Sequence, residues 1–147
     1  MSTTTLAMIK PDAVAKGVAG QILGHLEQQG FRLRAIRMLH LSQAQARAFY
    51  AVHRERPFYD ALVRFMTSGP VIPMLLEREG AVAELRRAIG ATDPAEAEPG
   101  TVRALYAESK ERNAIHASDS DENAALEGAF FFAAAEVLVT AQPVSGG

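Results

Sequence analysis

The 147-residue sequence contains no cysteine. This absence excludes disulfide scaffolds, thiolate zinc sites, iron–sulfur ligation and cysteine nucleophiles. A strong charge of one sign is also missing, because 15 Lys and Arg residues nearly balance 17 Asp and Glu residues, which leaves a net charge of −2. A duplex-binding domain usually has a large positive net charge, which this chain lacks, so we expect no specific nucleic-acid partner. Arginine is unevenly distributed along the chain, so binding of an anion at one local site stays open.

Long apolar runs are missing too. The late run from Gly128 to Ala135 is bounded by Glu127 and Glu136, and it is far shorter than the roughly 20 apolar residues that a membrane span needs. The first residues lack the basic region of a secretory signal. We therefore expect a cytoplasmic protein with no membrane partner.

Several common catalytic motifs are absent. The sequence contains neither GxxxxGK[ST] nor GxGxxG, so any nucleotide chemistry must bind phosphates in another way. No HExxH motif and no pair of histidines at i, i+3 or i, i+4 supports a histidine metal site. A GxSxG elbow is missing, although composition alone does not exclude a Ser/His/Asp triad.

Length and composition are typical of one ordinary globular domain. Apolar residues make up 48% and charged residues 22% of the chain, and domains cluster at about 100–150 residues. The last six residues are small and polar, which is typical of a mobile end. We expect a single domain over residues 1–141 and a flexible C-terminal tail over residues 142–147.

Hydrophobic spacing predicts strands that alternate with helices. A change of parity near Ala35 predicts a bulge in the second strand, and Pro73 favours an edge position for the third. The long segment 91–100 is expected to be a loop, and such loops are often functional. This alternation predicts a two-layer α/β or α+β sandwich. The expected strands cover residues 4–9, 31–41, 69–77 and 113–117, and the expected helices cover residues 18–30, 42–50, 57–66 and 80–89 and a last segment capped by Ser118 or Ser120.

One of the four histidines stands out. His25 and His40 fit solvated or capping roles, whereas His116 lies where a strand-like segment gives way to a helix start. Backbone N–H groups are free at such a junction and can face a cleft. Glu127 follows one helix later and could orient an imidazole. From the local sequence alone, a surface histidine beside a capping serine is an equally good interpretation.

Cationic and aromatic side chains suggest how a phosphorylated ligand could be bound. Arg86 and Arg103 bracket the loop that contains Thr92, and guanidinium groups suit phosphate oxygens. Phe58 follows Pro57 at an expected helix start and could stack on a base. Taken one at a time, each has an ordinary alternative, such as a solvated helix face or core filling.

Together these segments resemble nucleoside diphosphate kinases. Eight segments occur in order and at family-like spacing from about residue 3 to residue 139. They are IKPDAV at 9–14, QQGF at 28–31, FY at 49–50, HRERPF at 53–58, MTSGPV at 66–71, GATDP at 90–94, PGTVR at 99–103 and NAIHASDS at 113–120. The GATDP segment and YAES at 106–109 resemble the bacterial branch of the family.

The resemblance implies a fold and an activity. The implied fold is a ferredoxin-like α+β sandwich with a mainly antiparallel four-stranded sheet covered by helices. The implied reaction transfers the γ-phosphoryl group of a nucleoside triphosphate, mainly ATP, to a nucleoside diphosphate. It is a ping-pong reaction through a phosphohistidine, with Mg²⁺ carried by the nucleotide phosphates and no direct protein ligand. The family also forms homo-oligomers, either tetramers or hexamers.

The resemblance assigns roles to eleven residues. His116 would be the nucleophile, acting through Nδ1, with Glu127 and Ser118 to orient it. Lys10 and Tyr50 would lie by the transferred phosphoryl group, and Lys10 and Asn113 would bind the ribose. Phe58 would stack on the base. The remaining implied ligands, which would bind the phosphates, are Arg86, Thr92, Arg103 and His53.

Two departures from the family pattern, Ala117 and Lys110, and two alternative functions remain. Lys110 occupies a position where the family often has an aliphatic residue near the base. Ala117 follows the expected nucleophile, where the family usually has glycine, and a positive φ there would cost about 1–3 kcal/mol. The chain could instead be a phosphohistidine carrier that serves a partner protein, or a nucleotide-binding relative that Ala117 has weakened. The three consecutive residues Phe130, Phe131 and Phe132 exceed what one helix face can bury, which favours an oligomer.

Overall fold

Four strands form one antiparallel sheet in the computed structural model, which describes residues 2–140. The strands lie in the order β2-β3-β1-β4 and every neighbouring pair is antiparallel. The predicted ferredoxin-like α+β class is therefore confirmed, whereas the predicted tail over residues 142–147 lies outside the described residues. The strands are β1 (Thr4–Ile9), β2 (Arg32–Ile36), β3 (Ile72–Glu77) and β4 (Ile115–Ala117).

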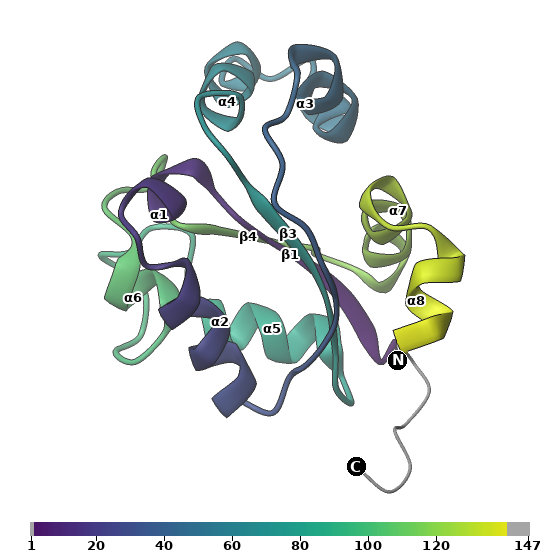
Figure 1. Cartoon of the computed structure of the whole chain (residues 1–147). Coiled ribbons are helices and arrows are strands. Elements are labelled where there is room, and N and C mark those ends of the chain that lie inside the picture. Colours follow the sequence, from purple (N-terminus) through teal and green to yellow (C-terminus); the bar gives the residue numbers. More distant parts are fainter. Residues whose placement is uncertain (1, 141–147) are drawn as a thin grey trace, which may run out of the picture.

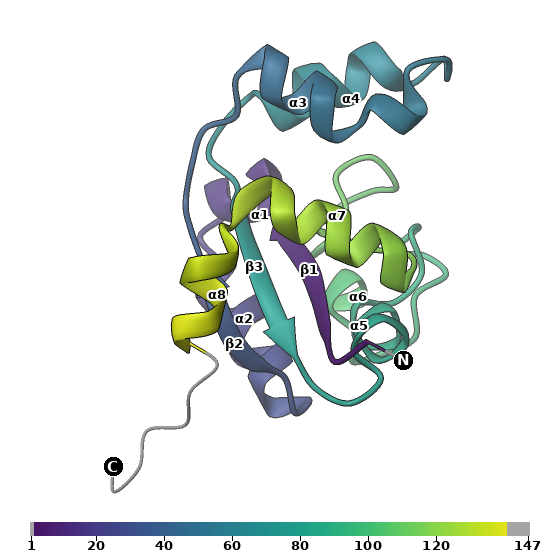
Figure 2. The same cartoon turned by 90° about the vertical axis from the view of Figure 1, so that its right-hand side faces the viewer.

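Helices pack around the sheet, and two of them project from one end of it. Figure 1 shows the sheet with α2, α5 and α6 on one side and α7 and α8 on the other. The hairpin of α3 and α4 stands apart at one end of the strands (Figures 1 and 2). The helices are α1 (Pro11–Ala15), α2 (Ala19–Gln28), α3 (Gln43–Phe49), the 3₁₀ turn η1 (Ala51–His53), α4 (Tyr59–Met66), α5 (Ala81–Ile89), α6 (Val102–Tyr106), α7 (Asp121–Phe131) and α8 (Ala134–Thr140).

The sheet is covered on both faces, which corrects the predicted two-layer arrangement. Successive side chains of a strand point to opposite faces. In β1, Ala7 and Ile9 join the cluster with α2 and α5, whereas Leu6 and Met8 join the cluster with the hairpin and the end of α7. All four are almost fully buried. A strand that is apolar on both parities needs a helical layer on each side, and Figure 2 shows α7 in front of the sheet.

Local signals set several elements as predicted. The register of β2 against β3 shifts between Leu33 and Ala35, which confirms the bulge. Ser42 caps α3 through a complete capping box with Gln45. Gly90 ends α5, and Ser120 rather than Ser118 caps α7. Each device satisfies backbone groups that a helix end or a bulge would leave unpaired.

Pro73 does not place its strand at the sheet edge, so that prediction is wrong. β3 lies between β2 and β1, and Pro73 pairs with Met8. The Pro73 carbonyl accepts the N–H of Arg37, just after the last residue of β2. In a strand the N–H and C=O of one residue face the same neighbour. The missing N–H of proline therefore falls where the ladder with β2 is already ending.

Other element boundaries differ from the prediction. β2 ends at Ile36 instead of residue 41, and only an isolated bridge between Leu39 and Val71 continues the pairing. The helix expected from residue 57 begins at Tyr59. Helices α1, α6 and α8 were not predicted. For α1 the signal was present, because Pro11 occupies the first turn, where proline is well tolerated.

The aromatic run at residues 130–132 is mostly covered within one chain. Phe131 and Phe132 are each 4% exposed and Phe130 is 41% exposed. Phe132 lies after the last residue of α7, so it does not need a place on the face of that helix. The run therefore does not supply the apolar surface on which we based the expected oligomer. Among the described residues, no helix combines the length and the apolar character of a membrane span.

Candidate active site

His116 lies in β4 and is held by α7. It pairs with Met8 of β1, and its Nε2 lies 2.7 Å from Oε1 of Glu127. Ser118 Oγ donates to the same oxygen at 2.7 Å. A carboxylate only accepts, so this contact assigns the ring proton to Nε2 and leaves a lone pair on Nδ1. The three residues predicted to form the nucleophile and its support are thus brought together.

Aromatic side chains from the end of α3 surround the imidazole. The rings of Phe49 and Tyr50 lie 5.3 Å and 6.0 Å from the His116 ring, both edge to face. The Tyr50 hydroxyl is buried and has no hydrogen-bond partner among the described residues. Burial, reinforced by the charge of Glu127, raises the pKa of Tyr50, so it stays a neutral phenol. A buried O–H without a partner is costly unless a ligand accepts it.

Lys10 and Asn113 meet where β1 has just ended and β4 is about to begin. Lys10 is 9% exposed, and its Nζ donates to Oδ1 of Asn113 at 2.9 Å. Asn113 Nδ2 in turn donates to the carbonyl of Thr92 at 3.2 Å, which ties in the loop 91–100. Burial and the charge of Arg103 lower the pKa of Lys10 to about 8, against the opposite effect of Asp12. Lys10 is therefore mainly cationic at neutral pH.

Arg103, in α6, holds the backbone next to Lys10 and Asn113 through hydrogen bonds. It is 7% exposed and donates to the carbonyls of Gly90 at 3.0 Å, Ile115 at 2.8 Å and Asn113 at 3.4 Å. Burial and Arg86 lower the pKa of Arg103 to about 10, so the group keeps its charge at neutral pH. A guanidinium has five N–H donors. Three of them hold the backbone, and the other two have no hydrogen bond among the described residues.

Two further predicted phosphate ligands, Arg86 and Thr92, lie at the surface. Arg86 projects from α5, and its Nη1 reaches the carbonyl of Ala117 at 3.4 Å. Thr92 is exposed in the loop after Gly90. A hydrogen bond from Asn123, with smaller effects of Arg86 and His116, lowers the pKa of Asp119. Asp119 thus adds a negative charge near this end of the site.

A strained turn precedes His116, the predicted nucleophile. Ala114 has φ of +74°, the only positive value for a non-glycine residue between residues 2 and 140. The N–H of Ile115 donates to the carbonyl of Asn113 at 2.9 Å, which closes a γ-turn. Ala117 has no such conformation and pairs with Ala7 in the sheet. The prediction of strain at Ala117 is therefore wrong. The strained residue is Ala114, three positions earlier.

His53 and Phe58 form a pair at the end of the helical hairpin. Their ring centres are 5.5 Å apart, and Phe58 is 50% exposed. The N–H of His53 donates to the carbonyl of Tyr50 at 2.8 Å. A short piece of backbone thus links this pair to the residues around His116. An aromatic face that is half open to solvent is available for stacking.

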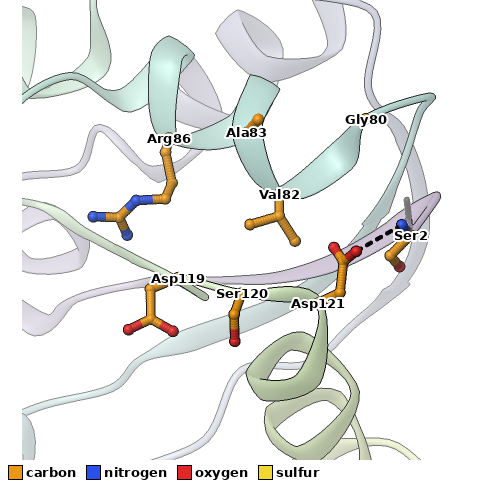
Figure 3. A pocket seen from close by; sticks show the side chains of 8 residues that line it. All are labelled: Ser2, Gly80, Val82, Ala83, Arg86, Asp119, Ser120 and Asp121. Carbon is orange, nitrogen blue, oxygen red and sulfur yellow. Dashed lines mark hydrogen bonds between the residues drawn. The ribbon is translucent and has the colours of Figure 1, made fainter.

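A surface hollow lies beside the residues around His116. It has a volume of about 410 Å³ and is lined by Ser2, Gly80, Val82, Ala83, Arg86, Asp119, Ser120 and Asp121. Figure 3 shows Arg86 of α5 across from Asp119 and Ser120, which lead into α7. It shares only Arg86 with the eleven predicted residues. The hollow is therefore a neighbour of the cluster around His116 and not its centre.

Sequence reasoning missed three residues that contact or influence this cluster. Phe49 was noted only as part of the family-like FY segment, although its ring lies against His116. Asp12 was interpreted as a strand stop, although its carboxylate accepts the Ala114 N–H from 102 residues away. Asp119 affects the charge near Arg86. Local sequence carried no signal for contacts of such long range.

Metal-ligating side chains do not gather in the part of the chain that the structure describes. Residues 2–140 contain no cluster of three or more His, Asp or Glu side chains arranged to bind a metal ion. The predicted site instead includes three cationic side chains, namely Lys10, Arg86 and Arg103.

Comparisons with known proteins agree on one family. The sequence model of nucleoside diphosphate kinase matches residues 3–137. The chain is 59% identical to the nucleoside diphosphate kinase of Chlorobaculum parvum over 134 residues, which cover 91% of this chain and 96% of that protein. It is 58% identical to that of Nitratiruptor sp., again over 134 residues and with 91% and 98% coverage.

Solved structures give the same result. The nucleoside diphosphate kinase of Aquifex aeolicus matches with a TM-score of 0.90 at 46% identity, over 92% of this chain and 98% of that one. The Halobacterium salinarum enzyme, solved in complex with CDP, matches with a TM-score of 0.88 at 37% identity, over 93% and 91%. The family model, the bacterial relatives and these structures lead to one conclusion: the chain belongs to the nucleoside diphosphate kinase family.

Proposed function

We propose that this protein transfers the γ-phosphoryl group of a nucleoside triphosphate to a nucleoside diphosphate through a phosphohistidine on His116. The observation that carries the proposal is the contact between His116 Nε2 and Glu127, which leaves Nδ1 as the nucleophilic nitrogen. Nδ1 forms a bond to the γ-phosphorus, and the bond from phosphorus to the β–γ bridging oxygen breaks. The nucleoside diphosphate leaves with that electron pair. A terminal oxygen of the second diphosphate then displaces Nδ1.

The surrounding residues stabilise the negative charge of this transfer. The transition state is loose, so positioning and charge neutralisation supply most of the catalysis. Lys10, the free donors of Arg103 and the exposed Arg86 supply positive charge, and the Tyr50 hydroxyl is the buried donor still without a partner. Mg²⁺ on the nucleotide phosphates would neutralise further charge. Glu127 stabilises the proton on Nε2 as Nδ1 becomes bonded to phosphorus.

The remaining predicted residues bind the nucleotide. Lys10 and Asn113 bind the ribose, Thr92 and His53 assist with the phosphates, and Phe58 stacks on the base. The relative solved with CDP supports a nucleotide as the ligand of this fold. Stacking on an aromatic ring tolerates any base, so we expect little preference among bases, with ATP as the main donor.

Assembly and location are also proposals. We infer a single domain that forms a homo-oligomer, either a tetramer or a hexamer, in the cytoplasm. Support for assembly comes from the family and from the edge strand β2, at whose end Ile36 and the nearby Met38 are 44% and 61% exposed. A nucleotide substrate and a cysteine-free sequence fit a reducing compartment.

Intact-mass measurement tests the mechanism. After brief incubation with Mg²⁺ and ATP, the protein should gain one phosphoryl group and lose it when a different nucleoside diphosphate is added. His116→Ala should gain none, whereas the control His25→Ala should behave like the parent. A phosphoryl group gained by His116→Ala would overturn the assignment.

The two alternatives give different results in the same experiment. A carrier that serves a partner protein would take no phosphoryl group from ATP alone. A weakened relative would bind nucleotide without forming the adduct. The ordinary backbone of Ala117 removes the reason for expecting such a weakened site.

A further inference from the structure

Asp12 is a buried carboxylate to which the proposed chemistry gives no role. It lies in α1 and is only 2% exposed. Its Oδ2 accepts the backbone N–H of Ala114 at 3.0 Å. Its Oδ1 is buried without a hydrogen-bond partner among the described residues. Burying an ionisable carboxylate is costly, so a sequence that keeps one beside the active site gains something from it.

The bond from Asp12 holds the strained residue of the site. Ala114 has φ of +74° and is fully buried. A residue with a Cβ adopts this conformation only where its surroundings enforce it. Its N–H is bonded to the Asp12 carboxylate, and its carbonyl accepts the N–H of Lys10 at 2.9 Å. Residues 10–12 thus hold Ala114 through both of its backbone polar groups.

The same turn connects two parts of the site. Asn113, just before it, holds Nζ of Lys10, and Ile115, just after it, leads directly to His116 in β4. A change in the φ angle of Ala114 would rotate Asn113 relative to His116. The expected ribose ligand and the expected nucleophile would then no longer face one nucleotide. The geometry of this turn therefore matters for phosphoryl transfer as well as for folding.

We propose that Asp12 is a positioning residue: its carboxylate holds Ala114 in the left-handed turn and so fixes Asn113 and His116 relative to Lys10. Asp12 itself contacts neither nucleotide nor phosphoryl group. This inference rests on the proposed function, because it concerns the same nucleophile. It also makes a separate claim about the turn, which can be tested without any chemistry.

A suppressor substitution tests the inference. Asp12→Ala removes the acceptor and should slow the phosphorylation of His116 by Mg²⁺ and ATP at least tenfold in single-turnover measurements. Glycine adopts positive φ without the steric penalty that alanine pays. Adding Ala114→Gly to Asp12→Ala should therefore recover most of the lost rate, measured against Ala114→Gly alone. A carboxylate that only stabilised the fold would gain nothing from this second change.

A matched control separates an effect on the turn at Ala114 from a general loss of stability. The Asp121 carboxylate also accepts a distant backbone N–H, that of Ser2 at 3.1 Å, away from the turn. Asp121→Ala should lower the rate less than threefold. If Asp12→Ala fails to fold, Asp12→Asn takes its place, since the amide keeps an uncharged acceptor that should give an intermediate rate. An unchanged rate in Asp12→Ala, or no recovery in a folded double variant, would overturn the proposal.

Amide hydrogen exchange provides a test that does not depend on the reaction. In Asp12→Ala the segment 112–117 should exchange at least tenfold faster than in the parent, and in Asp121→Ala it should not. Unchanged exchange in that segment would refute the role of Asp12. If the parent itself takes no phosphoryl group from ATP, the proposed function fails, and exchange still decides the claim about the turn.

Discussion

At the scale of single residues, one carboxylate oxygen organises His116, the proposed nucleophile. Glu127 Oε1 accepts from both His116 Nε2 and Ser118 Oγ. Because both donors converge on it, this oxygen fixes the tautomer and the orientation of the imidazole together. Hydrogen bonds to charged groups are worth about 1.5–3 kcal/mol, and each 1.36 kcal/mol is a factor of ten in rate.

Glu127→Gln should therefore lower the rate of His116 phosphorylation by about 10–100-fold. The amide lacks the charge that stabilises the Nε2 proton, and it can present N–H to the ring instead of oxygen. Single-turnover kinetics with Mg²⁺ and ATP measures the loss. Glu122→Gln, on an exposed position of the same helix, is the control. A Glu127→Gln rate within twofold of the parent would mean that the contact does not orient the nucleophile.

Lys10 makes a pH dependence testable. Its pKa is lowered to about 8, so the cationic form is complete well below pH 8 and is lost as the pH rises through that value. Since kcat/KM reports ionisations of the free enzyme, kcat/KM for ATP should fall above about pH 8.

Lys10→Met should show a low kcat/KM without this decline, whereas Lys16→Met, which changes an exposed lysine, should keep it. The pH profile of kcat/KM for the three proteins decides the matter. A parental profile that stays flat from pH 7 to pH 10 would mean that the charge of Lys10 is not needed for nucleotide capture.

At the scale of elements, the end of α5 positions the loop that carries Thr92. Gly90 has φ of +86° and ψ of −179°, a conformation essentially reserved for glycine. A Cβ there would lie 2.5 Å from Oγ1 of Thr101, the cap of α6. The Gly90 carbonyl also accepts from Arg103. This glycine therefore allows close approach between the ends of two helices and the buried arginine.

Gly90→Ala should destabilise the fold by at least about 1–3 kcal/mol, because the clash with Thr101 adds to the backbone strain, and this lowers Tm by at least roughly 3–10 °C for a chain of this size. Differential scanning calorimetry measures the change. Gly100→Ala is a matched control, because Gly100 has the same φ of +86° but open space around its Cβ position. The loss should be smaller at Gly100. Equal losses at both positions would show that the contact with Thr101 adds nothing.

At the scale of the whole molecule, the sheet joins two halves of the site. Lys10 follows the last residue of β1 and His116 lies in β4, whereas Tyr50 and Phe58 belong to the hairpin of α3 and α4, which stands at one end of the sheet (Figure 2). The hairpin projects from one end of the sheet and touches it mainly through the cluster around Tyr50 and Met66. Phe58, the proposed base-stacking residue, is thus part of the hairpin that projects from the sheet.

The proposed assembly is a prediction at this scale. Light scattering after size exclusion should give a mass of four or six chains at micromolar concentration. The physical reason is the apolar surface left at the β2 edge, where Ile36 and Met38 are exposed. Met38→Asp should weaken the assembly, and Gln43→Asp, at an exposed polar position, should not. A monodisperse parental monomer would contradict the proposal.

Much of the fold could be predicted from the sequence, because local patterns specify local structure. The bulge at Ala35, the capping box of Ser42 and the stop at Gly90 each depend on a few neighbouring residues. The central position of Pro73 could not be predicted in this way. It depends on where the neighbouring strand ends, and that is a property of the assembled sheet.

The sequence by itself determined the family, the nucleophile candidate and the types of its supporting groups, since these follow from residue identity and spacing. Only the tertiary structure decided which atoms meet. Glu127 contacts Nε2 of His116. The residue with positive φ is Ala114 and not Ala117. Asp12 binds the N–H of Ala114, which lies 102 residues away in the sequence. Such contacts arise when distant segments pair in one sheet, and no local pattern encodes them.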